Sequence, residues 1–306
     1  MVKGLPQMSS IDIESTQPVR HILSLSGGKD SSALAVYMRD RVPTMEYVFC
    51  DTAKELPETY EYIDRLAAYL GKGTQVVATK ELAKYRPNQL AGWAARNVII
   101  LRNHDDEFDR LLEIRRGYLP SPRMRWCTEL LKLRPFEQYV GDDPVISYIG
   151  IRYDEANPDR KGYISHKPNV EARYPFVDAQ MGMRDIERLL EESGLGMPDY
   201  YRWRSRSGCY FCFFQQRIEW VGLLENHPDL FECAAQYEKD DPATGGRYTW
   251  VQRESLRELS TPQRVAEIRE EHARRISEAA RWHRNRALAD VLSGDDSERA
   301  CLICSL

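Results

Sequence analysis

The sequence lacks any long apolar run. No stretch of about 18 consecutive apolar residues occurs, and residues 1–17 are polar with an early proline, so neither a membrane span nor a secretory signal is expected and the predicted location is cytoplasmic. An excess of positive charge is also absent, because 43 Lys and Arg face 47 Asp and Glu, for a net charge of −4. Such a chain is not a polycation that coats nucleic acid, so any nucleic-acid contact must be local.

The number of cysteines is not even, as it usually is in a protein held together by disulfides. The chain has seven cysteines, and four of them form two C-x-x-C pairs, Cys209 with Cys212 and Cys301 with Cys304. In a reducing compartment this pattern indicates metal or redox chemistry rather than disulfide cross-links. The 306 residues, 42% of them hydrophobic, suffice for one large or two modest domains.

Short apolar runs alternate with helical patterns in the first half of the chain. The predicted strands are 21–25, 46–50, 74–78 and 145–151, and the predicted helices include 59–70, 183–193 and a long one from Pro262 towards Leu292. Alternation with short connections predicts an α/β fold with a mostly parallel sheet and helices on both faces. We therefore expect a nucleotide-binding α/β domain at 20–178 and a mainly helical, cysteine-bearing region at 179–306.

The most specific feature is a glycine loop, Ser26-Gly27-Gly28-Lys29-Asp30-Ser31-Ser32, between the first predicted strand and the helix that follows it. Glycines let the backbone fold closely around a ligand, and the N-terminus of the helix offers unpaired N–H groups, so the expected guest is a phosphate. A P-loop would need glycine at position 23 and Ser or Thr at position 30, where this chain has Leu23 and Asp30. The alternative without a ligand is a Gly-Gly turn capped by Asp30 and Ser31.

This loop resembles the SGGxDS signature of the PP-loop ATP pyrophosphatases, which cleave ATP between the α and β phosphates. The resemblance implies an adenine-nucleotide-hydrolase-like fold, ATP with Mg²⁺ as ligands, and Lys29 and Asp30 as catalytic residues, with Asp30 near the metal. The residues that it implies for binding phosphates are Ser26, Gly27, Gly28, Lys29 and Ser31.

Two further segments resemble the phosphoadenosine-phosphosulfate reductase branch of that superfamily. Residues 49–59 are similar to its DTG…E.PET stretch, with Ala53 where glycine is usual. Asp51, with Thr52 beside it, would then coordinate magnesium or orient ATP at the carboxyl end of a strand; a simple helix cap is the alternative. Residues 150–160 look like the GIR..E…R element that contacts substrate, which implies binding roles for Arg152, Glu155 and Arg160.

The cysteines continue the resemblance. Cys127 lies in a segment that resembles the CT..LK..P motif, especially as it occurs in the ATP pyrophosphatases of DNA phosphorothioation systems. Residues 207–212 look like the glycine plus C-x-x-C element of the iron-sulfur members. This implies a [4Fe-4S] cluster, with Zn²⁺ as the alternative because it accepts the same thiolates. Two ligand sets stay open: Cys127, Cys209 and Cys212 with one of Cys301 and Cys304, or the two C-x-x-C pairs with Cys127 as a free reactive thiol. A third possibility is that Cys301 and Cys304 act as a redox shuttle.

Basic residues gather between Arg110 and Arg134. Guanidinium groups bind phosphates through paired hydrogen bonds, so this cluster favours a second phosphorylated substrate; a solvated helix face is the alternative.

The resemblance as a whole implies an ATP pyrophosphatase that adenylates an acceptor for sulfur incorporation. Its implied partners are a cysteine desulfurase or other sulfur donor and a nucleic acid as acceptor, and the chain acts either as a homo-oligomer or as a subunit of a complex. One rival is a phosphoadenylyl-sulfate or adenylyl-sulfate reductase, although residues 299–304 lack the Glu-Cys-Gly and histidine of those tails. The other is a non-catalytic nucleotide-sensing subunit that uses its metal structurally.

Overall fold

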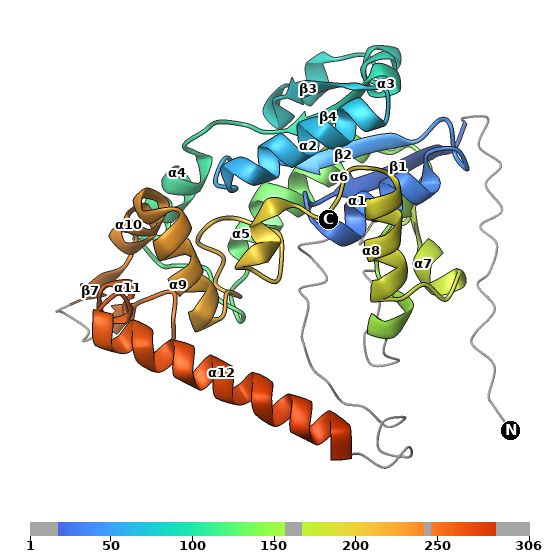
Figure 1. Ribbon diagram of the computed structural model, residues 1–306. Helices are drawn as coiled ribbons and strands as arrows, with labels where there is room; N and C mark the ends of the chain where they lie inside the picture. The colour runs from blue at the N-terminus through green and yellow to red at the C-terminus, as the bar shows by residue number, and fades with distance from the viewer. Residues whose placement is uncertain (1–17, 157–166, 242–245, 286–306) are drawn as a thin grey trace, which may run out of the picture.

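A six-stranded sheet forms the centre of the computed structural model, which describes residues 18–156, 167–241 and 246–285 (Figure 1). All of its strands run parallel, in the order β3-β4-β2-β1-β5-β6. They are β1 (Arg20–Leu25), β2 (Glu46–Cys50), β3 (Gly73–Val77), β4 (Asn97–Leu101), β5 (Val145–Tyr148) and β6 (Val170–Arg173). The predicted α/β fold with a parallel sheet is therefore confirmed.

Helices cover both faces of the sheet because successive strand residues point to opposite sides. Leu23 and Leu25 face one layer, formed by α1 (Lys29–Met38), α2 (Pro57–Tyr69) and α8 (Met183–Glu192). Ile22 faces the other layer, which includes α3 (Pro87–Arg96) and α6 (Arg134–Val140). The α8 helix begins beyond the predicted domain boundary at residue 178 and still packs beside α1 (Figure 1).

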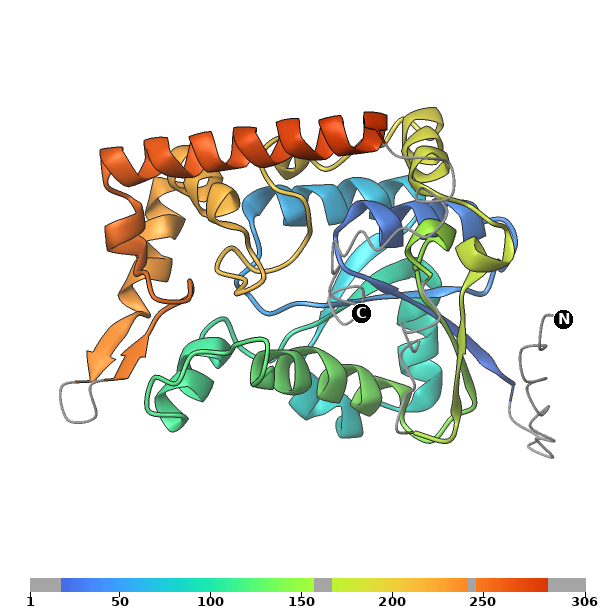
Figure 2. The ribbon, with the colours of Figure 1, turned by 90° about the horizontal axis from the view of Figure 1, so that it is seen from below.

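The second half of the chain is mainly helical, as predicted, and builds a separate aromatic core. Phe108 and Trp126, from the first half of the chain, stack there with Phe211 and Trp250. The elements around this core are α4 (Glu107–Ile114), α5 (Trp126–Thr128), η4 (Asp199–Arg202), α9 (Arg217–Asn226), α10 (Pro228–Gln236), α11 (Leu256–Leu259) and α12 (Pro262–Asn285). Figure 2 shows these helices to one side of the sheet, with α12 running along the molecule. None of the described helices is long and apolar enough to cross a membrane.

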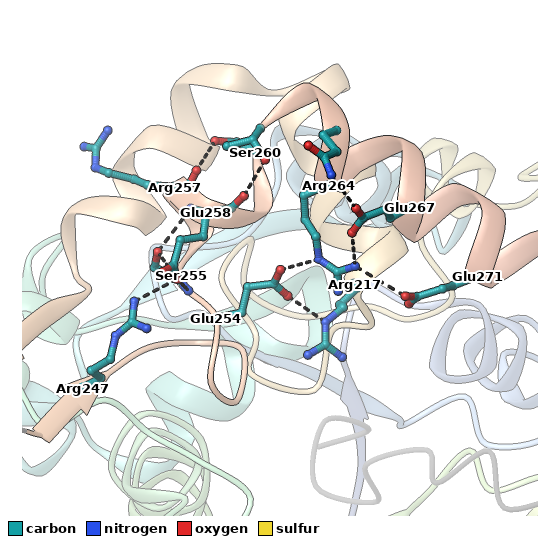
Figure 3. Close-up of polar contacts among 12 residues, drawn as sticks. Arg217, Arg247, Glu254, Ser255, Arg257, Glu258, Ser260, Arg264, Glu267 and Glu271 are labelled. Carbon is teal, nitrogen blue, oxygen red and sulfur yellow. Dashed lines mark hydrogen bonds and ion pairs between the residues drawn. The ribbon is translucent and has the colours of Figure 1, made fainter.

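A network of ion pairs holds the start of α12 (Figure 3). Glu254 accepts from Arg217 Nε at 2.9 Å and from Arg264 Nε at 2.5 Å, and Arg264 Nη1 also reaches Glu267 at 3.0 Å. Since Arg217 belongs to α9 and Arg264 to α12, the single carboxylate of Glu254 ties the two helices together.

Smaller elements complete the described chain. They are η1 (Thr79–Lys84), a π-helical turn η2 (Glu129–Leu133) between α5 and α6, η3 (Tyr153–Glu155), α7 (Pro175–Asp178) and the antiparallel pair β7 (Lys239–Asp241) and β8 (Gly246–Tyr248).

Three of the four predicted strands appear with bounds that agree to within one residue. The strand predicted at 145–151 ends at Tyr148, because the chain then turns to pack Gly150 on α1: a Cβ on Gly150 would lie 3.0 Å from the backbone oxygen of Asp30. The strands β4, β6, β7 and β8 were not predicted. The predicted helix towards Leu292 is described as far as Asn285.

Candidate nucleotide and thiol site

The carboxyl ends of three neighbouring strands carry most of the predicted site. The chain leaves β1 towards β2 on one side, while β5 pairs with β1 on the other, so the strand order reverses at β1. Open α/β sheets bind ligands in the crevice at such a switch point. The glycine loop follows β1, Asp51 follows β2 and Arg152 comes shortly after β5. The structure therefore brings these sequence-predicted residues to one edge of the sheet.

The glycine loop holds its shape through its own serines and its packing on α2. Ser31 Oγ accepts from the backbone N–H of Ser26 at 3.1 Å and lies 3.0 Å from Ser26 Oγ. Gly27 has a φ of +69°, and a Cβ there would lie 2.5 Å from Cγ2 of Thr59. A larger residue here would have to displace the Thr59 side chain and adopt a left-handed backbone, which accounts for the first glycine of the pair.

A segment from η4 to Ser207 lies directly on the loop. The Tyr201 hydroxyl accepts from the backbone N–H of Lys29 at 3.2 Å, and the Lys29 ammonium lies 4.9 Å from the centre of the Tyr201 ring. Ser207 Oγ donates to Ser26 Oγ at 3.3 Å. The Tyr201 hydroxyl thus occupies an amide of the kind that binds phosphates at helix N-termini, so an anion on that amide must displace or share it.

Opposite charges meet beside the loop. Arg152, a buried residue, donates to Asp30 Oδ1 at 2.8 Å and pairs with Asp154 at 2.9 Å and Glu155 at 2.6 Å. Lys29 Nζ lies 3.5 Å from the other oxygen of Asp30. The structure therefore joins Asp30, Arg152 and Glu155 in one cluster. Arg160, predicted alongside them, lies outside the described residues.

Asp51 is fully buried, and its two oxygens already have donors. Oδ1 accepts from the N–H of Ala53 at 2.8 Å and from Tyr60 at 2.9 Å, and Oδ2 accepts from Arg102 Nε at 2.6 Å. Coordination of a magnesium ion would need one of these donors to leave. Ala53 has a φ of 57°, the left-handed region that favours glycine. Sequence reasoning missed Arg102 because it directly follows β4, a strand that was not predicted.

A buried group of polar side chains lies next to Asp51. Thr52 Oγ1 is 3.1 Å from the sulfur of Cys209 and donates to Glu55 Oε1 at 3.1 Å, and Lys132 Nζ is 4.0 Å from the same oxygen. Burial raises the pKa of both the Cys209 thiol and the Glu55 carboxyl. Glu55 and Lys132 were not predicted as site residues. Glu55 lies in the segment that resembles the DTG…E.PET stretch and Lys132 in the one that resembles CT..LK..P, so these motifs could have indicated them.

Three of the five predicted cysteines lie in one neighbourhood. The N–H of Cys212 donates to the backbone oxygen of Cys209 at 3.0 Å, so these two close a tight turn. Burial, aided by the nearby Cys212, raises the pKa of Cys127 to about 11. Cys301 and Cys304 lie outside the described residues.

No three His, Cys, Asp or Glu side chains are grouped as a metal site within the described part of the chain. The described donors therefore do not by themselves form a cluster, zinc or magnesium site. The choice among these metals stays a prediction.

The six-stranded parallel sheet with helices on both faces defines the chain as an α/β protein. Residues 20–175, about half of the chain, match the family model of the phosphoadenosine phosphosulfate reductase domain. The chain belongs to this family, which indicates an enzyme of nucleotide-linked sulfur chemistry. The closer likeness to DNA phosphorothioation enzymes remains a proposal.

Several known proteins are similar to the chain. An uncharacterized 37.8 kDa protein of Escherichia phage 186 is 26% identical over 254 residues, which are 72% of this chain and 74% of that protein. The uncharacterized protein MJ0973 of Methanocaldococcus jannaschii is 24% identical over 217 residues, 68% of this chain but only 45% of that relative. The crystal structure of phosphoadenylyl-sulfate reductase from Candida auris, a phosphate complex, superimposes with a TM-score of 0.43 at 13% identity, covering 63% of this chain and 82% of that one.

Proposed function

We propose that the protein is an ATP pyrophosphatase that adenylates an acceptor for sulfur incorporation, with a nucleic-acid phosphate as the acceptor. The observation that carries this proposal is the place of the glycine loop at the switch point of the sheet, with Lys29 at the start of α1. Thr52, shortly after the end of the neighbouring strand β2, contacts the half-buried thiol of Cys209. A phosphate-binding loop and a thiol at one edge suit a reaction that joins nucleotide and sulfur chemistry.

The first step is adenylation. An acceptor oxygen attacks the α phosphorus of ATP, so that an oxygen–phosphorus bond forms and the bond to the β phosphate breaks. The leaving pyrophosphate gains negative charge, which the amides of Gly28 and Lys29 and the Lys29 ammonium stabilise. Mg²⁺ bound to the triphosphate would enter with the nucleotide. The Asp30–Arg152 pair holds the start of α1 against the chain that follows β5.

The second step exchanges AMP for sulfur. A sulfur donor such as a cysteine desulfurase delivers persulfide sulfur, and a thiol reductant supplies the two electrons that convert it to hydrosulfide. The sulfur then attacks the activated phosphorus; a phosphorus–sulfur bond forms as the bond to AMP breaks. Cys127, half-buried beside Cys212, is the thiol that we assign to the relay of sulfur.

A product assay tests this function against its rivals. Anaerobically purified protein is incubated with ATP and Mg²⁺, with and without DNA, and AMP, pyrophosphate and sulfite are measured. AMP and pyrophosphate in equal amounts support the proposal. Sulfite released from a sulfonucleotide, without AMP from ATP, would instead assign the protein to the reductases that share its family. Absence of both activities would favour a nucleotide-sensing subunit.

A further inference from the structure

A basic groove opens beside Cys127. Its volume is about 640 Å³, and its wall includes Trp126 and Thr128, the two neighbours of Cys127 in the chain. The charged residues that line it are Arg115, Arg123, Arg125, Arg134, Glu129 and Glu137. Arg134 pairs with Glu129 at 2.7 Å, which leaves an excess of positive charge. This groove is distinct from the glycine loop, because no loop residue lines it.

Aromatic rings, rather than carboxylates alone, position several of these guanidinium groups. Arg115 lies 5.1 Å from the centre of the Trp126 ring, and Arg125 lies 4.9 Å from that of Phe214. Arg206 also stacks on Phe214, at 5.1 Å. A cation–π contact orients a guanidinium group without neutralising its charge. Two arginines therefore contact the ring of Phe214, which stands two residues after Cys212 in the chain.

Arg115 also has an unused donor. Its Nε is buried and has no hydrogen-bond partner among the residues that the structure describes. A buried donor without a partner is unfavourable, so a ligand that accepts a hydrogen bond from it gains affinity. The matching ligand is an anion with oxygens that accept from a planar fork, and a phosphate is the usual one.

We infer that this groove holds the sugar-phosphate backbone of a single strand of nucleic acid. Arginines from the end of α4, the 121–125 turn and α6 line one groove, so it offers a track of phosphate sites rather than one. The volume of the groove lies in the range of small-ligand sites, about 300–1,000 Å³, which suits a short length of one strand better than a double helix. The side chain of Met124, 48% exposed on the lining, offers apolar surface to a base.

This inference rests on the proposed function in one respect, that the strand is the acceptor of adenylation. The place of the groove supports that role, because a phosphate bound beside Trp126 lies next to Cys127. The net charge of −4 for the whole chain is consistent with a contact confined to one groove.

Binding of a 12-nucleotide single-stranded DNA with a fluorescent label, followed by anisotropy on the full chain, tests the groove. Arg123→Ala is the first variant, because Arg123 is exposed and its loss should leave the fold intact. We expect roughly 3–10-fold weaker binding at moderate salt and a slope of log Kd against log salt reduced by about 0.7, the value for one phosphate contact of a single strand. Arg115→Ala should act in the same direction. Arg188→Ala on α8, an arginine with a comparably exposed side chain at 62%, is the matched control and should bind normally.

Unchanged binding by Arg123→Ala and Arg115→Ala, or equal weakening by Arg188→Ala, would overturn the inference. Duplex DNA bound as tightly as the single strand would overturn it too. The proposed function fails separately: a wild-type protein that binds the strand but releases no pyrophosphate from ATP keeps the groove and loses the adenylation. Pyrophosphate release from ATP without binding of the strand would keep the adenylation and overturn the groove as the strand site.

Discussion

Tyr201→Phe removes the hydroxyl that covers the glycine loop and leaves the ring in place. In the structure this hydroxyl accepts from the N–H of Lys29, and the Lys29 ammonium lies over the ring. Phenylalanine keeps the cation–π contact and loses only the oxygen. If a phosphate of ATP takes the same N–H, the hydroxyl competes with it. The variant should therefore be less stable without nucleotide and bind nucleotide more tightly.

The size of both effects follows from the hydrogen bond. A neutral hydrogen bond contributes about 0.5–1.5 kcal/mol net, and a length of 3.2 Å lies at the weak end of the range. A loss of about 0.5–1 kcal/mol in the free energy of unfolding is expected from urea titrations. Since 1.4 kcal/mol is a factor of ten, the Kd for ATP should fall roughly 2–5-fold. Calorimetry with a non-cleavable α,β-methylene analogue of ATP measures this without turnover.

The neighbouring tyrosine provides the control. The Tyr200 hydroxyl donates to the backbone oxygen of Gly27 at 2.7 Å, and a carbonyl oxygen is not a phosphate ligand. Tyr200→Phe should thus lower stability without any gain in nucleotide affinity. An unchanged or weaker affinity of Tyr201→Phe, or an equal gain in both variants, would refute the competition between Tyr201 and the phosphate.

Three further predictions concern packing, charge and metal. Gly28→Ala places a Cβ 2.7 Å from Ser207 Oγ and should lower the free energy of unfolding in urea by about 1–3 kcal/mol. Adding Ser207→Gly should recover most of this loss. An equal loss with and without Ser207 would show that the contact with Ser207 is not its cause. Burial acts to raise the pKa of Glu254, but hydrogen bonds from Arg264 and Arg217 outweigh it and the pKa is lowered. The stabilising effect of the Glu254 carboxylate is therefore present above its ordinary pKa and is lost as the pH falls through the lowered pKa. Glu254→Gln should thus lower the Tm at pH 7, and its difference from the wild type should shrink as the pH falls through that lowered pKa. A Tm difference that persists in acid would contradict this. Cys212→Ser should reduce the iron and sulfide, or the zinc, of anaerobically purified protein, and an unchanged metal content would remove Cys212 from the ligand set.

Much of the fold could be predicted because its signals are local. The glycine loop lies between an apolar run and an amphipathic segment, and the strand at 46–50 appears with the predicted bounds. The missed strand β4 shows the limit. Its residues Asn97–Leu101 follow α3 without any break, so no turn residue separates the helix from the strand.

The site was predictable where a motif carried it and not where it depends on tertiary packing. Asp30 and Arg152 were both named from motifs, but their contact requires β1 and β5 to be neighbours. Tyr201 on the loop comes from a segment about 170 residues away, and no local pattern marks it. The contact between Tyr201 and the glycine loop could therefore not be predicted from the sequence.

Hydrogen exchange of the backbone amides, with and without the α,β-methylene analogue of ATP, tests the central claim most directly. The prediction is slower exchange at residues 26–32, where the phosphates would bind, together with faster exchange at residues 199–207 as Tyr201 leaves the loop. Protection confined to another part of the chain at saturating nucleotide, with residues 26–32 unchanged, would contradict the assignment of the glycine loop as the nucleotide site.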